Sequence, residues 1–164
     1  MVGIVVWLVR RLVFYSLVER EKSTMRKRII QALQGIAETH DVRILYACES
    51  GSRAWGFASQ DSDYDVRFIY VRKPEWYLSI DLEHKPDVIE LPIVDELDVN
   101  GWDLRKALQL FRKSTPPLLE WLDSPIVYLE NDSAAARLRP LAPTSYSPMA
   151  CMYHYFKMAK GNIR

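Results

Sequence analysis

The chain has 164 residues, of which 49% are hydrophobic and 26% are charged. This length suits one domain with its own core and is short for two, and the composition is that of an ordinary globular protein. The formal net charge of +1 argues against a dedicated duplex-DNA-binding domain, because such domains carry a clear basic excess. Two cysteines, Cys48 and Cys151, are too few for a disulfide framework or a zinc cluster. We expect two buried thiols in a reducing, cytoplasmic protein.

Residues 1–24 form an apolar and basic segment. The stretch from Gly3 to Val18 is strongly apolar, but Arg10 and Arg11 interrupt it, and it is shorter than a membrane span requires. Three interpretations stay open: an appended amphipathic helix, a segment that precedes a natural start at Met25, and a membrane anchor. We expect an appendage to a domain that begins at residue 25, with no membrane contact unless this segment anchors the chain.

The first predicted elements of that domain are one helix and two strands. Apolar residues at three- and four-residue steps predict an amphipathic helix that Ser23 or Thr24 caps; the stripe consists of Met25, Ile29, Leu33, Ile36 and Ala37. The short β-prone runs 42–48 and 64–71 predict two strands. A glycine turn at Gly51 ends the first strand, and Pro74 ends the second.

Short strands and helices continue to the end of the chain. The acidic stretch 81–103 contains two strand patterns, DVIEL and ELDV. Residues 102–114 predict a helix that two prolines stop, and residues 118–122 predict a shorter one. The domain is expected to span residues 25–130. Residues 131–164 read as a loop and the start of an incomplete helical region, with a helix beginning at Ser147–Pro148 and no C-cap after it.

The sequence GSRAWGFASQDSDYDVRF, from Gly51 to Phe68, places a glycine turn about ten residues ahead of two aspartates. Alternate side chains of a strand share a face, so Asp63 and Asp65 are expected side by side. Two carboxylates that close repel each other, and a fold tolerates them when a cation holds them. Hard oxygen ligands suit Mg²⁺, which proteins bind with one or two carboxylates plus substrate phosphates.

The glycine turn itself is suited to phosphate. Gly51 allows the backbone to approach a phosphate group closely, and the N–H groups that open the following helical turn can donate to phosphate oxygens. Ser52 adds a hydroxyl, and Arg53 adds a cation for triphosphate charge. One half of the stretch is therefore suited to phosphates and the other half to metal.

This stretch resembles the active-site signature of the polymerase-β-like nucleotidyltransferase superfamily: an apolar strand, Gly-Ser, about ten residues, then Asp-apolar-Asp. It is especially similar to predicted bacterial nucleotidyltransferases found near RNA ligase genes. The similarity extends through ELDVNGWDLRKALQLFRKSTPPLLEWLDSPIVY and covers the chain from about Met25 to its end. The resemblance implies a third carboxylate on a later strand. Asp98 matches that position, Glu96 is the reserve candidate, and Asp103 fits a helix N-cap better than a ligand.

The resemblance implies a nucleotidyltransferase fold of the α/β class: a small mixed β-sheet with helices on one side, followed by a truncated helical segment. It also implies a Mg²⁺-dependent enzyme that transfers an NMP from an NTP to a hydroxyl acceptor, releasing pyrophosphate by a two-metal mechanism. The expected catalytic and metal-binding residues are Asp63, Asp65 and Asp98, and the expected NTP-binding residues are Gly51, Ser52 and Arg53.

The metal is expected to be Mg²⁺ or Mn²⁺, and the acceptor an RNA 3′ end or a protein. Two alternatives stay open. One is an antitoxin-like module that nucleotidylates a partner protein. The other is a regulatory module that binds nucleotide without turnover.

Overall fold

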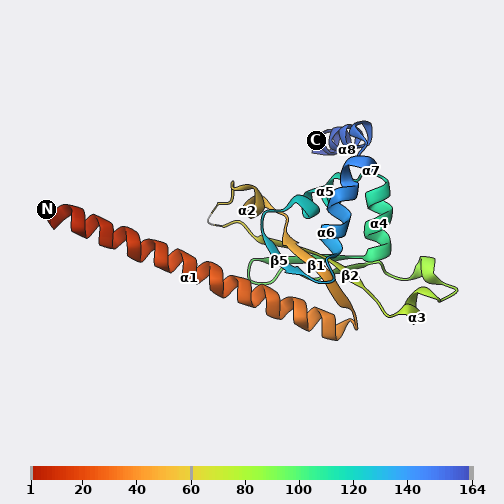
Figure 1. The fold of residues 1–164 in the computed structure, drawn as a ribbon, viewed down its shortest axis with the longest axis horizontal. Coiled ribbons are helices and arrows are strands. Elements are labelled where there is room, and N and C mark those ends of the chain that lie inside the picture. Colours follow the sequence, from red (N-terminus) through yellow and green to blue (C-terminus); the bar gives the residue numbers. More distant parts are fainter. Residues whose placement is uncertain (1, 60, 163–164) are drawn as a thin grey trace.

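A five-stranded mixed sheet forms the centre of the molecule in the computed structural model, which describes residues 2–59 and 61–162 (Figure 1). For residues 2–19 and 162 it describes the backbone only. The strand order is β3-β4-β2-β1-β5. Strands β2 and β4 run parallel, and the other neighbouring pairs are antiparallel. The strands are β1 Arg43–Glu49, β2 Tyr64–Val71, β3 Val88–Glu90, β4 Leu97–Asp103 and β5 Val127–Glu130.

Helices cover both faces of this sheet. Helix α1 (Val2–Thr39) packs Ile29, Leu33 and Ile36 against one face. Helices α4 (Leu104–Arg112), α5 (Pro116–Asp123) and α6 (Ala134–Leu138) cover the other face (Figure 1). The predicted mixed α/β nucleotidyltransferase-like fold is therefore confirmed, but its helices are not all on one side.

Strand β2 shows why two helical layers are needed. Its alternate residues Val66 and Phe68 belong to the core under α1, whereas Ile69 belongs to the core under α4 and α5. Side chains of a strand alternate between the two faces, so a central strand that is apolar on both faces requires cover on both. Helical periodicity in the sequence identifies an apolar stripe without identifying which face of the sheet it meets.

Helix α1 begins earlier than the sequence predicts. It is one continuous helix from Val2, so the predicted boundary at residue 25 falls inside it. The predicted N-cap near Ser23 is wrong: the Thr24 hydroxyl donates to the Arg20 carbonyl at 2.9 Å, an i to i−4 bond within a continuing helix. Among the described residues, no helix combines the length and the hydrophobicity that crossing a membrane demands.

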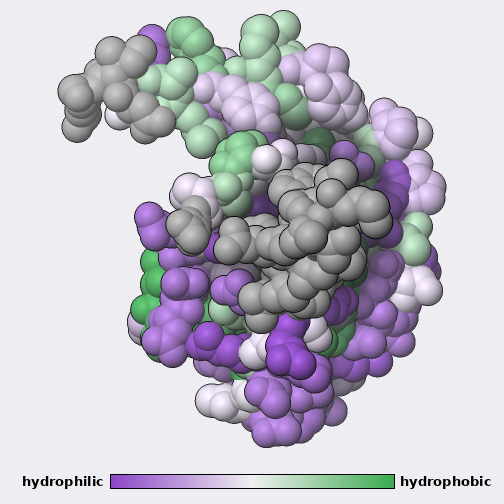
Figure 2. Space-filling model, turned by 90° about the vertical axis from the view of Figure 1, so that its left-hand side faces the viewer, coloured by the Kyte–Doolittle hydropathy of each residue, from purple (hydrophilic) through white to green (hydrophobic). Residues whose placement is uncertain are grey.

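The segment predicted as a loop from residue 131 is largely helical. It contains α6, the 3-10 helix η2 (Arg139–Leu141) and α7 (Ala142–Ser145), and it leads into α8 (Pro148–Asn162). A proline is the second residue of both η2 and α7, which fits these short helices because N–H groups of a first helical turn have no intrahelical partner. Figure 2 shows green and pale residues along the top of the molecule, where α8 exposes most of Met149, Met152 and Tyr153.

The remaining elements are short. They are α2 (Ser52–Trp55), α3 (Pro74–Tyr77) and the 3-10 helix η1 (Leu82–His84). Helix α2 follows β1 directly, and the loop after it leads back into β2. This connection is the stretch that the sequence identifies as the candidate phosphate and metal site.

Candidate active site

Two carboxylates meet where the parallel strands β2 and β4 begin. Asp65 and Asp98 are register partners across this pair, so both side chains leave the sheet on the same face. Asp65, Arg67 and Ile69 alternate along β2 and therefore share one face. Ile69 belongs to the core under α4, α5 and α6, so the two carboxylates lie on the face that these helices cover. The two side chains are 29% and 26% exposed. The pair is therefore accessible to solvent, and Asp98 lies beside Asp65.

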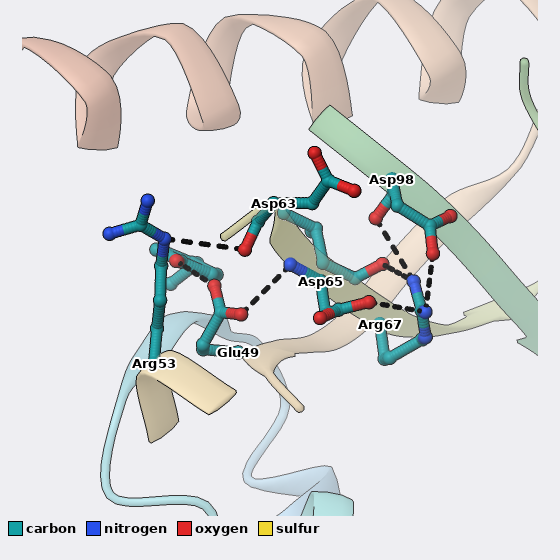
Figure 3. Close-up of polar contacts among 8 residues, drawn as sticks. Glu49, Arg53, Asp63, Asp65, Arg67 and Asp98 are labelled. Carbon is teal, nitrogen blue, oxygen red and sulfur yellow. Dashed lines mark hydrogen bonds and ion pairs between the residues drawn. The ribbon is translucent and has the colours of Figure 1, made fainter. Parts of the chain in front are cut away.

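Arg67 lies between the two carboxylates (Figure 3). Its Nη2 donates to Asp65 Oδ1 at 2.9 Å and to Asp98 Oδ2 at 2.7 Å, and its Nη1 donates to the Asp98 carbonyl at 3.0 Å. One guanidinium offsets one of two negative charges, so the cluster keeps a negative charge in excess. Arg67 is not among the site residues predicted from the sequence. Its strand parity, two residues after Asp65, is the signal that could have found it.

Asp63 lies outside this cluster. It precedes the first residue of β2, its side chain is exposed, and in Figure 3 its carboxylate points toward the side on which α1 passes. The alternation that predicted a shared face applies within a strand, and this strand starts one residue later. Among the described residues, no group of three carboxylate, histidine or cysteine side chains is already gathered for a metal ion.

Gly51 packs directly against Asp65. A Cβ built on Gly51 would lie 1.7 Å from Asp65 Oδ2, and the neighbouring Ser50 N–H donates to the Asp65 carbonyl at 2.9 Å. Gly51 has φ −88°, which any residue adopts, so the missing side chain and not an unusual backbone explains this glycine. From the sequence, Gly51 is expected to let the backbone approach a phosphate; in the structure, the Asp65 carboxylate also fills the space that a side chain at this position would need.

Ser52 and Arg53 open α2 immediately after this glycine. Arg53 donates to the carbonyls of Ser62 at 2.5 Å and Asp63 at 3.3 Å, and its guanidinium lies 3.9 Å from the Tyr64 ring centre. These contacts fix the loop between α2 and β2. Part of the hydrogen-bonding capacity of Arg53 thus positions the chain that leads to Asp65.

Glu49 is a buried carboxylate behind the cluster, and the sequence analysis missed it. It is fully buried, and it accepts hydrogen bonds from the Asp65 N–H at 2.8 Å and from the Tyr128 hydroxyl at 2.6 Å. Burial raises the pKa of Glu49 above its ordinary value, although both hydrogen bonds oppose that rise. An acidic residue directly after the apolar run Ile44–Cys48 is the sequence signal for this buried carboxylate.

The charge balance of the cluster suits an added cation. Burial raises the pKa of Asp65, Arg67 lowers it, and the neighbouring carboxylate of Asp98 raises it again. Arg67 binds one oxygen of each carboxylate, which leaves the other oxygen of each outside the ion pairs. Hard oxygen donors with negative charge in excess fit Mg²⁺. Asp65 and Asp98 are the residues that could hold it, with Asp63 nearby in the chain.

A mixed sheet with paired carboxylates on its parallel strands and a Gly-Ser turn against one of them defines a protein of the polymerase-β-like nucleotidyltransferase class. The model of the family described as "RNA repair pathway DNA polymerase beta family" (RlaP) matches residues 25–164. The chain belongs to this family, which confirms the resemblance seen in the sequence.

One curated relative is similar over most of this chain. It is "Uncharacterized protein YcgL" of Bacillus subtilis (strain 168), 59% identical over 140 residues that cover 85% of this chain and 53% of that protein. The chain thus spans about half the length of the curated relative it matches. The comparison with solved structures gave no match.

Proposed function

We propose that the protein is a Mg²⁺-dependent nucleotidyltransferase, which transfers an NMP from an NTP to a hydroxyl acceptor and releases pyrophosphate. The observation that carries the proposal is the pairing of Asp65 with Asp98 on adjacent parallel strands, next to Gly51. Membership of a polymerase-β-like RNA repair family supports it. Mn²⁺ is the expected substitute metal.

The reaction is an in-line displacement at phosphorus. The acceptor oxygen forms a bond to the α-phosphorus, and the bond from that phosphorus to the oxygen bridging to the β-phosphate breaks. Pyrophosphate leaves with the bonding electrons, and the proton of the acceptor hydroxyl passes to the Asp98 carboxylate. Metal ions held by the carboxylates would supply electrostatic stabilisation of the attacking and leaving oxygens.

The residues of the chain have separate roles in this proposal. Asp65 and Asp98 would hold the metal ions, and Asp63 would complete the ligand set once its exposed side chain turns from the α1 side toward the pair. Gly51 allows close approach of the phosphates, and the backbone N–H groups that open the following helical turn, together with the Ser52 hydroxyl, donate to the β- and γ-phosphates. Arg53 fixes the loop before β2 and adds positive charge beside the triphosphate.

Label transfer tests the activity. The protein is incubated with each α-labelled NTP, Mg²⁺ and either total RNA or cell protein, and the labelled product is identified. Label on RNA with release of pyrophosphate is the expected result. Label on a protein instead favours the antitoxin-like alternative, and nucleotide binding without any transfer favours the regulatory one.

Single substitutions then assign the carboxylates. Asp65→Asn and Asp98→Asn should each lower turnover by roughly a hundredfold or more, the usual scale for losing one electrostatic stabiliser of the transition state. Glu96→Gln is the matched control, because Glu96 is an exposed acid two residues before Asp98. If Glu96→Gln loses turnover and Asp98→Asn keeps it, the assignment of the third carboxylate is wrong.

Metal binding has its own readout. With Mg²⁺ and a non-hydrolysable NTP at about a hundred times its Kd, the folded state gains roughly 2.7 kcal/mol, which is a Tm rise of about 5–10 °C for a domain of this size. The double substitution Asp63→Ala with Asp65→Ala should abolish the metal-dependent part of that rise without unfolding the protein. An unchanged rise in the double variant would refute the metal assignment.

A further inference from the structure

A basic and aromatic pocket lies on the opposite side of β2 from the paired carboxylates. Its volume is about 340 Å³, within the range of roughly 300–1,000 Å³ that ligand pockets occupy. Side chains from four parts of the fold line it: Lys22 and Arg26 of α1, Arg53 and Ala58 around α2, Tyr64 of β2 and Tyr128 of β5. Of these lining residues, the proposed reaction gives a role to Arg53 alone.

The chemistry of the lining is that of a nucleotide site. Three of its side chains are cationic, and no carboxylate lines it among the described residues. The Arg53 guanidinium lies 3.9 Å from the Tyr64 ring centre, which makes a flat cationic and aromatic wall. Positive charge combined with aromatic faces is how proteins bind unpaired nucleotides, because every base has a π-face and every linkage carries a phosphate.

Arg26 is held in place at this pocket. Its Nη2 donates to the Val127 carbonyl at 2.8 Å, and its guanidinium lies 5.5 Å from the Tyr128 ring centre. The pocket is therefore formed before any ligand enters, and its cation costs little additional ordering on binding.

The pocket and the carboxylates share one scaffold. Tyr64 precedes Asp65 in β2, and the Tyr128 hydroxyl donates to Glu49, which in turn accepts from the Asp65 N–H. In Figure 3 the Arg53 guanidinium and the Asp63 carboxylate both point toward the side on which α1 passes. A ligand in the pocket is therefore separated from the paired carboxylates only by the thickness of β2.

We propose that this pocket binds one nucleotide of a single-stranded nucleic-acid acceptor, with its base against the Tyr64–Arg53 wall and its phosphate near Arg26 and Lys22. This rests on the proposed function for the reaction itself. A single NTP that reaches Asp65 and Asp98 on one face of the sheet does not also fill a pocket on the other face. A single-stranded nucleic acid can reach both sites, because it can pass around the exposed start of β2.

Binding of a labelled oligonucleotide tests the proposal without catalysis. A fluorescein-labelled twelve-nucleotide oligouridylate is titrated with the full chain by fluorescence anisotropy, without NTP or metal. Arg26→Ala and Ala58→Glu should each weaken binding by roughly fivefold to a hundredfold, the range expected for the loss of one stacking or phosphate contact. Ala58 is exposed, so its replacement puts a negative charge into the pocket without removing a core contact.

Arg43→Ala is the matched control, because Arg43 is an exposed arginine at the far end of β1 whose ion-pair partner is Asp132. It should bind as the unsubstituted protein does. The pocket proposal is overturned if the chain does not bind the oligonucleotide, or if the two pocket variants bind it as tightly as Arg43→Ala. It is also overturned if they weaken binding of a fluorescent ATP analogue alone, since the pocket would then serve the donor nucleotide.

The two proposals fail separately. Pocket-dependent oligonucleotide binding without any label transfer would refute the proposed function and leave the pocket assignment intact. Label transfer to a protein, with no oligonucleotide binding, would refute the pocket assignment and leave the transferase activity intact.

Discussion

The two ends of the parallel pair β2–β4 differ in chemistry although they share one ladder of hydrogen bonds. At the start of the pair, Asp65 and Asp98 face each other across Arg67 and remain partly exposed. Further along, Phe68 and Gly101 are register partners in a closed core. The same strand pair thus holds charged groups together at one end, while apolar packing at the other end keeps the strands in register.

Two glycines, one at each end, illustrate this difference. A Cβ on Gly51 would meet the Asp65 carboxylate at 1.7 Å, and a Cβ on Gly101 would meet the Phe68 ring at 2.2 Å. Each glycine is needed because another side chain occupies its space. One of those side chains belongs to the candidate chemistry and the other to the core, so the two positions should fail in different ways.

The largest expected effect is on turnover in Gly51→Ala. The added methyl displaces the Asp65 carboxylate, and a misplacement of about 1 Å in a catalytic constellation costs roughly a hundredfold in rate. Gly101→Ala is the matched substitution at the other end; it should destabilise the fold by about 1–3 kcal/mol through overpacking, with turnover per folded molecule little changed. The comparison is measured by kcat and by denaturant unfolding of both variants. Equal loss of turnover in both would contradict a functional difference between the two ends.

Local patterns in the sequence predicted much of this arrangement. The bounds of β2 match the predicted strand, and Asp98 lies opposite Asp65 because the register of the parallel pair follows the apolar alternation of both segments. Asp103 caps α4, as predicted, by accepting from the Arg105 N–H at 2.8 Å. These features depend on neighbours in the sequence or on one strand pairing.

The features that the sequence analysis missed depend on contacts between distant segments. Arg67 binds Asp98, thirty-one positions later, and Glu49 accepts from Tyr128, seventy-nine positions later. Strand β5 has four residues, too few for a period to stand out. The metal and phosphate roles of the candidate residues, and the place of Asp63 among them, stay predictions for the experiments above.

Removing Arg67 should have the next largest effect, on stability. In Arg67→Ala the two carboxylates lose the cation between them, and the fold should lose about 1–3 kcal/mol at neutral pH without metal. Because Arg67 lowers the pKa of Asp65, its loss raises that pKa further. Between the ordinary pKa of an aspartate and the raised pKa of Asp65, the folded state then binds more protons than the unfolded state. The stability that Arg67→Ala loses should therefore be partly regained as the pH falls through the raised pKa of Asp65.

Thermal unfolding in EDTA from pH 7 to pH 4 measures this effect. Arg72→Ala, one residue beyond the end of β2, is the control, because Arg72 donates to the His40 carbonyl and lies over the Trp76 ring. It should lose stability without the same recovery on acidification. Mg²⁺ should raise the Tm of Arg67→Ala more than that of the unsubstituted chain, since it replaces the missing positive charge. Parallel pH profiles in the two variants would contradict the role given to Arg67.

Glu49→Gln should change the slope of stability with pH. The folded-state pKa of Glu49 is raised, so the unsubstituted fold gains stability as the pH falls from neutral through that pKa, and the gain ends below the unfolded-state value near 4.5. One such group contributes at most about 1.4 kcal/mol per pH unit. The glutamine variant should lack this contribution, whereas Glu90→Gln, at an exposed position of β3, should keep it. Urea unfolding between pH 4 and pH 7 distinguishes them, and identical slopes in all three proteins would disprove the assignment.

The smallest expected effect is that of deleting residues 1–24. This deletion compares the first part of α1 with the part that packs on the sheet. The side chains of residues 20–24 are exposed, and the family match begins at residue 25. The core contacts of the described part of α1 come from Ile29, Leu33 and Ile36, which the deletion keeps. The Tm should therefore stay within about 4 °C, the shift that roughly 1 kcal/mol produces in a domain of this size. Leu33→Ala in the full chain, by contrast, should cost about 2–5 kcal/mol, because Leu33 is 1% exposed. If the shortened chain unfolds at the temperature of Leu33→Ala or below it, residues 1–24 contribute to the core and are not an appendage.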